Sequence, residues 1–373
     1  MADSGKVRVL VGMSGGIDST AACMMLSEQG YEVVGLTIIN HSAGMTEEGG
    51  RPAYVDDAAS AASFLRIEHH IADERACFER DVCAPFVRKW MAGLTPNPCV
   101  ECNPAFKFRL LCFWADRLEC PLIATGHYAR ITNIDGRNYV SCAEDSGKDQ
   151  SYFLWKLEQN VLGRTLFPIG GFRKTEIRRY LAEKGYGPGP SKRESMEICF
   201  IENDYREYLR EKMPDVDEKV GPGAYVDSMG RIIGTHSGYP FYTVGQRKGL
   251  GVAFGTPRYV LRTNAEKNTV MLGTADQLTA LYMIVRNAVF TPEMRDDGLT
   301  VKIRYRSAAL PCCIQRVLDD GRIIVRFLTP ASAVTPGQYA VFYRNSTVVG
   351  GAEIDSQKGL GQYVECNGDS DSL

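Results

Sequence analysis

Long apolar runs, an excess of basic charge and repeated segments are all missing from this sequence of 373 residues. No stretch approaches the roughly 18 uninterrupted apolar residues that are typical of a membrane-spanning helix, so we expect no membrane partner. The first six residues, Met1–Lys6, lead directly into the strand-like segment Val7–Val11. That arrangement leaves no room for a signal or transit peptide, and we therefore expect a cytoplasmic protein.

The charge balance excludes one class of nucleic-acid-binding protein. The chain has 43 Lys and Arg residues against 45 Asp and Glu residues, a formal net charge of −2. A protein that coats nucleic acid through bulk charge would be basic, so an RNA client would need a local basic surface. Pairs that could build one, although each alone is typical of a solvated face, are Arg173-Lys174, Arg178-Arg179, Lys192-Arg193, Arg247-Lys248 and Arg304/Arg306.

Cysteine is plentiful, with twelve residues spread through the chain. A long chain without a secretion signal is expected to keep most of them reduced. Those that lie among apolar residues are predicted to be small core side chains rather than reactive groups. They are Cys23, Cys112, Cys120 and Cys142.

The first 130 residues alternate strand and helix patterns. Continuous apolar runs indicate strands that are buried on both faces, and Ala-rich or amphipathic segments between them indicate helices. Such alternation predicts an α/β fold with a doubly wound parallel sheet, which binds its ligands at the carboxyl ends of the strands. The expected strands are 7–11, 32–39, 67–71 and 121–126, and the expected helices include 19–29, 56–65 and 175–184.

The texture of the sequence changes near residue 206. Residues 220–273 are rich in Gly, Tyr and Val with closely spaced turn signals, which predicts a small central β-rich domain. Further strand-like segments follow from about residue 281 and predict a compact antiparallel barrel. We therefore expect a catalytic domain over 1–205, a central β-rich domain over 206–275 and a C-terminal β-barrel over 276–373. The end of the chain, 367–373, is predicted to be disordered.

A glycine-rich loop follows the first predicted strand and leads into the first helix. Its glycines let backbone N–H groups turn toward an anion, and the helix N-terminus adds positive potential. Two hydroxyls in the loop can donate to the same phosphate oxygens. Asp18 could either cap the helix or help to hold a Mg²⁺ that arrives with the nucleotide. The loop comprises Gly12, Met13, Ser14, Gly15, Gly16, Ile17, Asp18 and Ser19.

This loop lacks the Gly-Lys-Ser/Thr ending of the Walker type. The pattern Ser14–Ser19 instead resembles the pyrophosphate-loop ATPases, whose fold is that of the adenine-nucleotide alpha-hydrolases. The resemblance implies ATP as cosubstrate, cleaved to AMP and pyrophosphate while a substrate oxygen is adenylated. Gly126, at the end of the fourth predicted strand, would face the same crevice and permit close approach of the nucleotide. The neighbouring His127 could contact phosphate or satisfy its own local hydrogen bonds.

Two cysteine motifs make the resemblance more specific. The first is Asn97-Pro98-Cys99-Val100-Glu101-Cys102-Asn103, followed by Lys107-Phe108, and the second is Ile198-Cys199-Phe200-Ile201. Together with the segments 126–130, 148–154 and 245–251, and more weakly 304–306, they resemble the tRNA-specific 2-thiouridylases. The matches run from residue 12 to about residue 306 in the order found in that family.

The resemblance implies a function and a division of labour. The family thiolates C2 of the wobble uridine, position 34, in the anticodon stem-loop of tRNA, after adenylation of O2. Cys199 would carry a persulfide received from a donor such as a cysteine desulfurase or a sulfur-relay protein, and Cys102 would be the attacking thiol. Gly12–Ser19, Ile38 and Gly126 would bind ATP. The positions implied to contact tRNA or the target base are Asn97, Pro98, Cys99, Lys148, Asp149, Gln150, Arg304 and Tyr305.

Bringing the two cysteine motifs together is demanding. A disulfide requires Cα atoms within about 4.4–6.8 Å, so a loop must fold over the site. The stretch 185–197 carries the Gly and Pro residues that such a loop would use.

Two positions depart from the family pattern. Cys99 stands where the family usually has an Asp that is thought to act as acid or base, and Ile38 stands where Met is common. Either Cys99 or Cys102 could therefore be the resolving thiol. The C-x₂-C spacing also permits a zinc site, although the sequence offers no second pair of ligands and we expect no metal.

Two other classes of function stay open from the residues alone. Another pyrophosphate-loop synthetase, acting on a small molecule, would turn over ATP without tRNA and would not need Cys199. A non-catalytic RNA-binding or zinc-binding protein would not cleave ATP at all.

Overall fold

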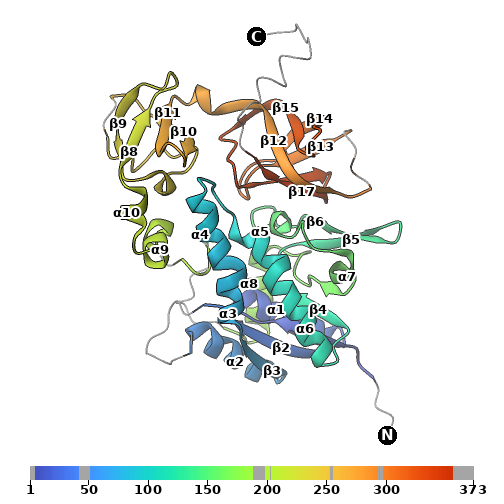
Figure 1. Cartoon of the computed structure of the whole chain (residues 1–373). Helices are drawn as coiled ribbons and strands as arrows, with labels where there is room; N and C mark the ends of the chain where they lie inside the picture. Colours follow the sequence, from blue (N-terminus) through green and yellow to red (C-terminus); the bar gives the residue numbers. More distant parts are fainter. Residues whose placement is uncertain are drawn as a thin grey trace. The chain divides into compact units, whose positions relative to one another are not determined.

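The computed structural model describes residues 5–41, 51–187, 198–201, 203–252, 255–292, 294 and 297–355 (Figure 1). Internal contacts divide the chain into two compact units. The first unit comprises Met1–Pro85, Pro98–Asn203 and Ser346–Val348. The second comprises Phe86–Asn97, Asp204–Asn345 and Val349–Leu373.

A parallel sheet forms the centre of the first unit. Its strands lie in the order β3-β2-β1-β4-β7, and each pair of neighbours is parallel. Reversal of the strand order on the two sides of β1 is the mark of a doubly wound sheet, as expected from the sequence. The strands are β1 (Arg8–Gly12), β2 (Glu32–Ile39), β3 (Glu68–Asp73), β4 (Leu122–Thr125) and β7 (Thr165–Leu166).

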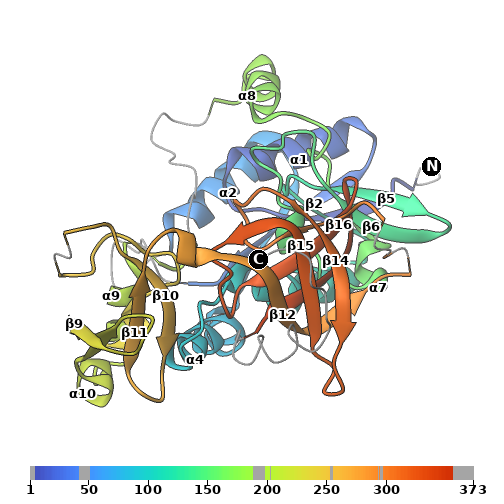
Figure 2. The same ribbon diagram turned by 90° about the horizontal axis from the view of Figure 1, so that it is seen from above.

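Helices cover both faces of this sheet, which explains the continuous apolar run in β1. Val9 and Val11 belong to a core shared with α1 (Ile17–Glu28), α2 (Ala53–Leu65) and α8 (Lys174–Glu183). Figure 2 shows α1 and α2 next to each other. The opposite face of β1 meets α6 (Arg109–Arg117), where the Leu111 side chain packs at Gly12.

The connection between β3 and β4 is helical and is interrupted by two π-helical segments. It contains α3 (Arg75–Phe78), the π-helix η1 (Glu79–Cys83), α4 (Ala84–Met91), α5 (Pro98–Cys102), the π-helix η2 (Asn103–Phe108) and α6. The C-x₂-C motif therefore lies on a short helix that leads into a π-helix. An antiparallel hairpin of β5 (Arg130–Ile134) and β6 (Arg137–Ser141), the 3₁₀ turn η3 (Ser151–Phe153) and α7 (Gln159–Leu162) complete this unit.

The second unit contains a small sheet and a closed barrel. The small sheet has the order β10-β11-β8-β9. The barrel strands follow the order β12-β15-β14-β13-β16-β17, and pairing of β12 with β17 closes the ring, which leaves no free edge. The elements are α9 (Tyr205–Lys212), α10 (Val216–Val220), β8 (Gly223–Val226), β9 (Ile232–His236), η4 (Tyr239–Phe241), β10 (Tyr259–Asn264), β11 (Thr269–Gly273), η5 (Asp276–Leu278), β12 (Thr279–Phe290), β13 (Leu299–Lys302), β14 (Leu310–Val317), β15 (Ile323–Ser332), β16 (Tyr339–Arg344) and β17 (Thr347–Ile354).

The barrel interior is a second hydrophobic core. Alternate residues of its strands are buried there, including Val301, Val325, Phe327 and Phe342. None of the helices in the described part of the chain is both long and apolar enough to span a membrane. The predicted disordered end, 367–373, and most of the predicted loop 185–197 lie outside the described residues.

Candidate functional site

The glycine-rich loop occupies the turn between β1 and α1. Ser19 Oγ accepts a hydrogen bond from the Ser14 backbone N–H at 3.3 Å and lies 3.5 Å from Ser14 Oγ. Gly15 adopts a φ of +67°, and a Cβ there would lie 2.6 Å from the Tyr54 carbonyl oxygen. The loop therefore requires glycine at this position for two reasons, conformation and space.

Gly126 is required by the loop itself. A Cβ on Gly126 would lie 2.7 Å from the Asp18 carbonyl carbon and 2.7 Å from the Ser19 nitrogen. The missing side chain thus lets the backbone of the loop pack on the end of β4. The sequence interpretation, in which this glycine makes space for the nucleotide, did not anticipate that the neighbouring chain fills this space.

Asp18 does not cap α1, and that alternative was wrong. The N-cap is Gly16, and no side chain caps it. The Asp18 carboxylate instead accepts two hydrogen bonds from Lys174 Nζ, at 2.8 and 2.7 Å, and one from the Tyr128 hydroxyl at 2.8 Å. Lys174 is buried and Asp18 is partly exposed, and this ion pair joins the start of α1 to the start of α8.

Met13 and Ile38 line the neighbouring strands. Met13 is buried, and its backbone N–H donates to the Leu36 carbonyl at 2.8 Å, which continues the β1–β2 pairing into the loop. Ile38 is half-buried near the carboxyl end of β2. Its side chain therefore retains exposed apolar surface on the edge of the sheet that carries the loop.

Three thiols interact within the first unit. Cys99 and Cys102 are half-buried on α5, and Cys199 is exposed as a residue although neighbouring groups desolvate its sulfur. All three are free thiols. Burial is the largest cause that raises the pKa of Cys102 to about 12 and the pKa of Cys199 to about 11, and it also raises the pKa of Cys99. Cys199 raises the pKa of Cys102, and Cys99 raises the pKa of Cys199. The fold thus brings together the two motifs that the sequence separates by 97 positions.

The turn that carries Cys199 is anchored on both sides. Phe200 is buried and meets the Phe78 ring edge-on, with ring centroids 5.5 Å apart. Asn40 Nδ2, at the end of β2, donates to Cys199 Sγ at 3.9 Å. The Tyr54 hydroxyl donates to Asn40 Oδ1 at 3.2 Å and accepts from the Asn40 backbone N–H at 3.3 Å, so it fixes the amide that faces the thiol.

One lysine, Lys107, interacts electrostatically with all three thiols. The positive charge of Lys107 lowers the pKa of Cys102, and it also lowers the pKa of Cys99 and of Cys199. Its Nζ lies 3.4 Å from His127 Nε2, and His127 Nδ1 lies 2.7 Å from Thr125 Oγ1. His127 therefore satisfies local hydrogen bonds, the second of the two alternatives that the sequence left open.

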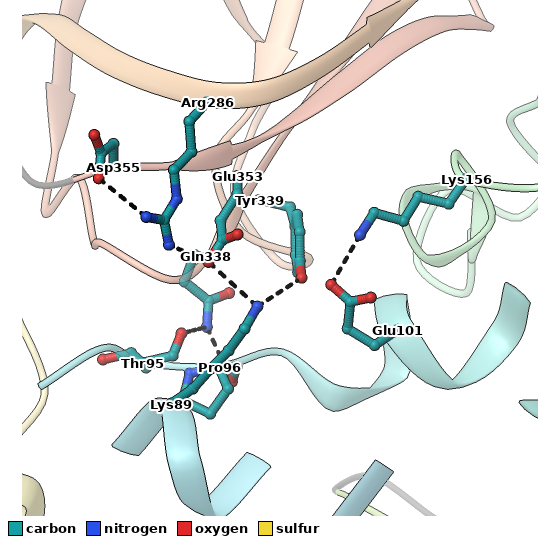
Figure 3. A network of polar contacts seen from close by, with 10 residues as sticks. All are labelled: Lys89, Thr95, Pro96, Glu101, Lys156, Arg286, Gln338, Tyr339, Glu353 and Asp355. Atoms are coloured by element: carbon teal, nitrogen blue, oxygen red, sulfur yellow. Dashed lines mark hydrogen bonds and ion pairs between the residues drawn. The ribbon is translucent and has the colours of Figure 1, made fainter. Parts of the chain in front are cut away.

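Helix α5 is held by contacts to the segment that follows the β5–β6 hairpin. Asn103 Nδ2 donates to the carbonyls of Cys99 and Phe153, at 3.0 and 3.2 Å. Lys156 pairs with Glu101 at 2.8 Å (Figure 3). These contacts fix the orientation of the C-x₂-C motif.

Two of the three residues at 148–150 support the local backbone. Asp149 is buried and accepts hydrogen bonds from the backbone N–H groups of Ala143 and Ser151. Gln150 Oε1 accepts from the Tyr128 N–H at 2.9 Å. Lys148 is half-buried. A tRNA contact at each of these positions stays a prediction.

The remaining predicted tRNA contacts belong to the second unit or to its boundary. The Arg304 guanidinium donates to the carbonyls of Val244 and Ala333, at 2.9 and 3.0 Å, and to Thr335 Oγ1. It therefore ties the barrel to the segment that precedes Gly245. Tyr305 and Asn97 are half-buried, and Pro98, the first residue of α5, is buried.

Sequence reasoning did not assign roles to four residues of this site. Lys107 entered only as part of a motif, and Asn40 and Tyr128 were not connected with the thiols or with Asp18. Lys174 was considered as half of a basic pair for RNA, but it is buried and paired with Asp18. Nothing in their local sequence distinguishes them from solvated or core residues. Among the residues that the structure describes, no group of three or more His, Cys, Asp or Glu side chains is placed to hold a metal ion.

Comparisons with known protein families match most of the chain in three parts. Family models match the tRNA methyl transferase HUP domain over residues 7–203, the tRNA methyl transferase PRC-barrel domain over 208–274 and the aminomethyltransferase beta-barrel domain over 282–354. Among solved structures, a 4-thiouridine synthetase in complex with RNA and bound ATP covers 56% of this chain and 51% of its own, at 19% identity and a TM-score of 0.33.

Curated relatives are much more similar over their full length. The tRNA-specific 2-thiouridylase MnmA 3 of Bacteroides fragilis (strain ATCC 25285) is 52% identical over 367 residues, covering 98% of each chain. The tRNA-specific 2-thiouridylase MnmA of Amoebophilus asiaticus is 44% identical over 362 residues, covering 94% of this chain and 95% of its own. With these identities and this coverage, the chain belongs to the tRNA-specific 2-thiouridylase family.

Proposed function

We propose that this protein is a tRNA-uridine 2-sulfurtransferase that replaces O2 of the wobble uridine, position 34, with sulfur at the expense of ATP. The observation that carries the proposal is the convergence of Cys99, Cys102 and Cys199 beside Lys107, in the same unit as the glycine-rich loop. Sulfur transfer needs two thiols within reach of each other, and activation of a carbonyl oxygen needs a nucleotide site. The relatives' names supply the substrate class.

The first half-reaction is adenylation. The uridine O2 attacks the α-phosphorus of ATP, pyrophosphate leaves, and an AMP ester replaces an oxygen that is a poor leaving group. The Gly12–Ser19 loop and the positive end of α1 would bind the phosphates. Gly126 would support the loop, and Ile38 would pack on adenine. Mg²⁺ would arrive with ATP, and the Asp18 carboxylate, which is paired with Lys174 in this structure, would be the residue of the loop that could help to hold it.

The second half-reaction moves sulfur. Cys199 would receive a sulfane sulfur from a persulfide donor and become Cys199–S–SH. The Cys102 thiolate would attack the inner sulfur, which forms a Cys102–Cys199 disulfide and releases HS⁻. The sulfide would add to C2 of the uridine, and AMP would leave with its oxygen. Reduction of the disulfide by an external thiol would restore the enzyme.

The anticodon base must leave its stack to reach this site, at a cost of a few kcal/mol. The predicted contacts at Asn97, Pro98, Lys148, Asp149, Gln150, Arg304 and Tyr305 would offset that cost. Cys99 would lie beside the target base, where the family usually has a carboxylate. A tRNA substrate agrees with the cytoplasmic location expected from the sequence.

The nucleotide products test the ATP half of the proposal. The purified protein is incubated with labelled ATP, with and without unmodified tRNA, and the products are separated. We expect tRNA-stimulated formation of AMP and pyrophosphate. If ADP and phosphate form instead, the protein does not use this chemistry. Turnover that is indifferent to tRNA would favour a small-molecule synthetase.

A further inference from the structure

We propose that Lys107 is the cation that stabilises the negative charge throughout sulfur transfer, and that His127 and Thr125 hold it in place. This inference rests on the proposed function for its chemical meaning. Its geometry and its test do not depend on tRNA.

The backbone places Lys107 on the side of the thiols. Cys102 ends α5, and the π-helix η2 begins at the next residue and includes Lys107. A π-helix forms hydrogen bonds between residues five apart and is wider than an α-helix, so residues four or five apart face the same side. The π segment therefore puts Lys107, five residues after Cys102, on the same side of the helix as that cysteine.

The contact to His127 holds the lysine without neutralising it. His127 is buried, and burial and the nearby Lys107 keep its pKa well below the usual value, so the ring is neutral. An ammonium has only donors, so Lys107 Nζ donates to His127 Nε2, and His127 Nδ1–H then donates to Thr125 Oγ1. Among the described residues, Lys107 Nζ contacts this neutral ring and pairs with no carboxylate. Its charge therefore stays available to the thiols.

The chemistry needs one cation at one place. Before the attack the negative charge is on Cys102 sulfur, and after it the charge is on the departing HS⁻, because the disulfide is neutral. The total charge of the reacting sulfurs is the same on both sides of the step. An ammonium that interacts with Cys102, Cys199 and Cys99 stabilises the charge on either side, and it would do so whether Cys102 or Cys99 attacks.

Desolvation of the three thiols is the effect that the Lys107 charge opposes. Desolvation favours the neutral thiol, and burial is the largest cause of the raised pKa at each of the three cysteines. Lys107 opposes it at all three. A rise of about one unit in a thiol pKa lowers the thiolate fraction at neutral pH about tenfold, and alkylation by iodoacetamide slows in proportion.

The experiment measures the alkylation rate of each cysteine against pH. The full-length wild-type protein, Lys107→Met, Lys107→Arg and a control variant, Lys184→Met, are treated with iodoacetamide. Peptide mass spectrometry then follows Cys99, Cys102 and Cys199 separately. Lys184 is an exposed lysine at the end of α8, and it pairs with Glu28 at the end of α1. Lys184→Met therefore removes the same charge at a site away from the thiols. Cys112, whose charged neighbours are Arg164 and Asp116, is the internal reference for folding.

We expect Lys107→Met to slow alkylation of Cys102 about tenfold at pH 8 and to move its pH profile upward, with smaller effects at Cys99 and Cys199. Lys107→Arg should stay near the wild type, and Cys112 should react equally in all four proteins. Equal Cys102 profiles in Lys107→Met and Lys184→Met would overturn the proposal. If Lys107→Met exposes Cys112, Lys107→Arg and His127→Gln decide instead. The proposal is supported if the pH profile of Cys102 alkylation stays as in the wild type in Lys107→Arg and moves to higher pH in His127→Gln. Any other pattern contradicts it.

Failure of the proposed function would be seen elsewhere. A wild-type protein that forms no 2-thiouridine would remove the function while leaving the alkylation profiles to report on Lys107. A protein that thiolates tRNA but shows no Lys107 effect would remove only this inference.

Discussion

In the part of the chain that the structure describes, the side-chain donor to the Cys199 thiol is an amide that is itself fixed. Asn40 Nδ2 faces Cys199 Sγ, and Tyr54 orients the amide through both its hydroxyl contacts. An amide donor stabilises a sulfur that carries partial negative charge, whereas a carboxylate in its place would repel it. We therefore predict that Asn40 positions the persulfide that we propose on Cys199.

Substitution of Asn40 tests this role. We expect Asn40→Asp to raise the pKa of Cys199 and slow its loading with sulfur more than Asn40→Ala does, although Asp is closer in shape. Tyr54→Phe should weaken loading less, because the amide donor remains although it loses the hydroxyl that orients it. Mass spectrometry of Cys199 after exposure to a persulfide donor gives the loaded fraction. Faster loading in Asn40→Asp than in Asn40→Ala would show that the amide does not act through charge.

The residues of the site could be predicted unequally from the sequence. The loop and the three cysteines have local patterns, and the structure brings Cys99, Cys102 and Cys199 together. The partners Lys107–His127, Asp18–Lys174 and Asn40–Tyr54 join positions that are 20, 156 and 14 residues apart. Such pairs depend on how strands and helices are placed in space, which no local pattern carries.

Among the elements, the turn from β1 to α1 was predicted most completely. The strand 7–11 and helix 19–29 correspond to β1 and α1, although α1 starts two residues earlier, at Ile17, because Asp18 pairs with Lys174 instead of capping the helix. The β5–β6 hairpin was not anticipated, because a helix and strand pattern dominated that part of the chain. The π-helices were also missed, since no residue type in 79–83 or 103–108 marks a π segment in the sequence.

Gly15 in the loop and Gly30 after α1 both have a positive φ, so substituting each by Ala gives a matched comparison. In Gly15→Ala the new Cβ meets backbone atoms of α2 and the residue keeps a φ of +67°. In Gly30→Ala the φ is +91° but nothing lies within 4 Å. Left-handed strain alone costs about 1 kcal/mol, so we expect Gly30→Ala to be destabilised by about that amount and to retain ATP binding.

Gly15→Ala carries the collision in addition to the strain. We expect it to lose ATP binding by at least tenfold, because the loop must move away from α2. Chemical denaturation and nucleotide titration of both variants provide the measurement. Unchanged ATP affinity in Gly15→Ala would show that the loop conformation is not needed for the nucleotide.

At the scale of the whole molecule, the chain passes from one compact unit to the other immediately before the cysteines. Residues 86–97 belong to the second unit, and Pro98 begins the return to the first. In the second unit this segment is tied to the barrel. The Thr95 N–H donates to the Pro336 carbonyl at 2.9 Å. Gln338 Nε2 donates to the Thr95 carbonyl at 3.1 Å (Figure 3). The barrel therefore restrains the chain that leads into the C-x₂-C motif.

A buried carboxylate completes this attachment. Glu353 is buried on β17 and pairs with Lys89 at 3.2 Å and with Arg286 at 3.1 Å, and Lys89 Nζ also donates to the Tyr339 hydroxyl at 3.1 Å (Figure 3). Loss of the charge would leave two cations without their shared partner. We expect Glu353→Gln to lower the free energy of unfolding by about 1–3 kcal/mol.

Glu353→Gln should also affect the C-x₂-C motif, because segment 86–97 leads directly into it. We expect Glu353→Gln to lower the rate of thiolation while leaving ATP affinity unchanged, since the loop lies in the other unit. Asp320→Asn, at an exposed ion pair with Arg322, is the control and should do neither. Denaturant titration and a 2-thiouridine assay on both variants provide the comparison. Equal stability of the two variants would contradict the role of Glu353.

The domain organisation was predicted from changes in composition, with boundaries at 205/206 and 275/276. Family models cover 7–203, 208–274 and 282–354. The contacts nevertheless form two compact units, and the short segment 86–97 groups with the later part of the chain. Composition does not reveal that grouping, because the grouping depends on contacts between residues far apart in the sequence. The hydrogen bonds of Thr95 with Pro336 and Gln338 are examples.

The central claim is that sulfur passes through Cys199 to the uridine, and analysis of tRNA nucleosides tests it most directly. Wild-type protein, Cys199→Ser, Cys102→Ser and Cys99→Asp are each incubated with ATP, unmodified tRNA and a persulfide donor, and 2-thiouridine is measured by mass spectrometry. Cys199→Ser should form none while still making AMP in the presence of tRNA. Cys102→Ser should form none and accumulate a persulfide on Cys199, and Cys99→Asp should remain active. Undiminished donor-dependent 2-thiouridine from Cys199→Ser would contradict the account.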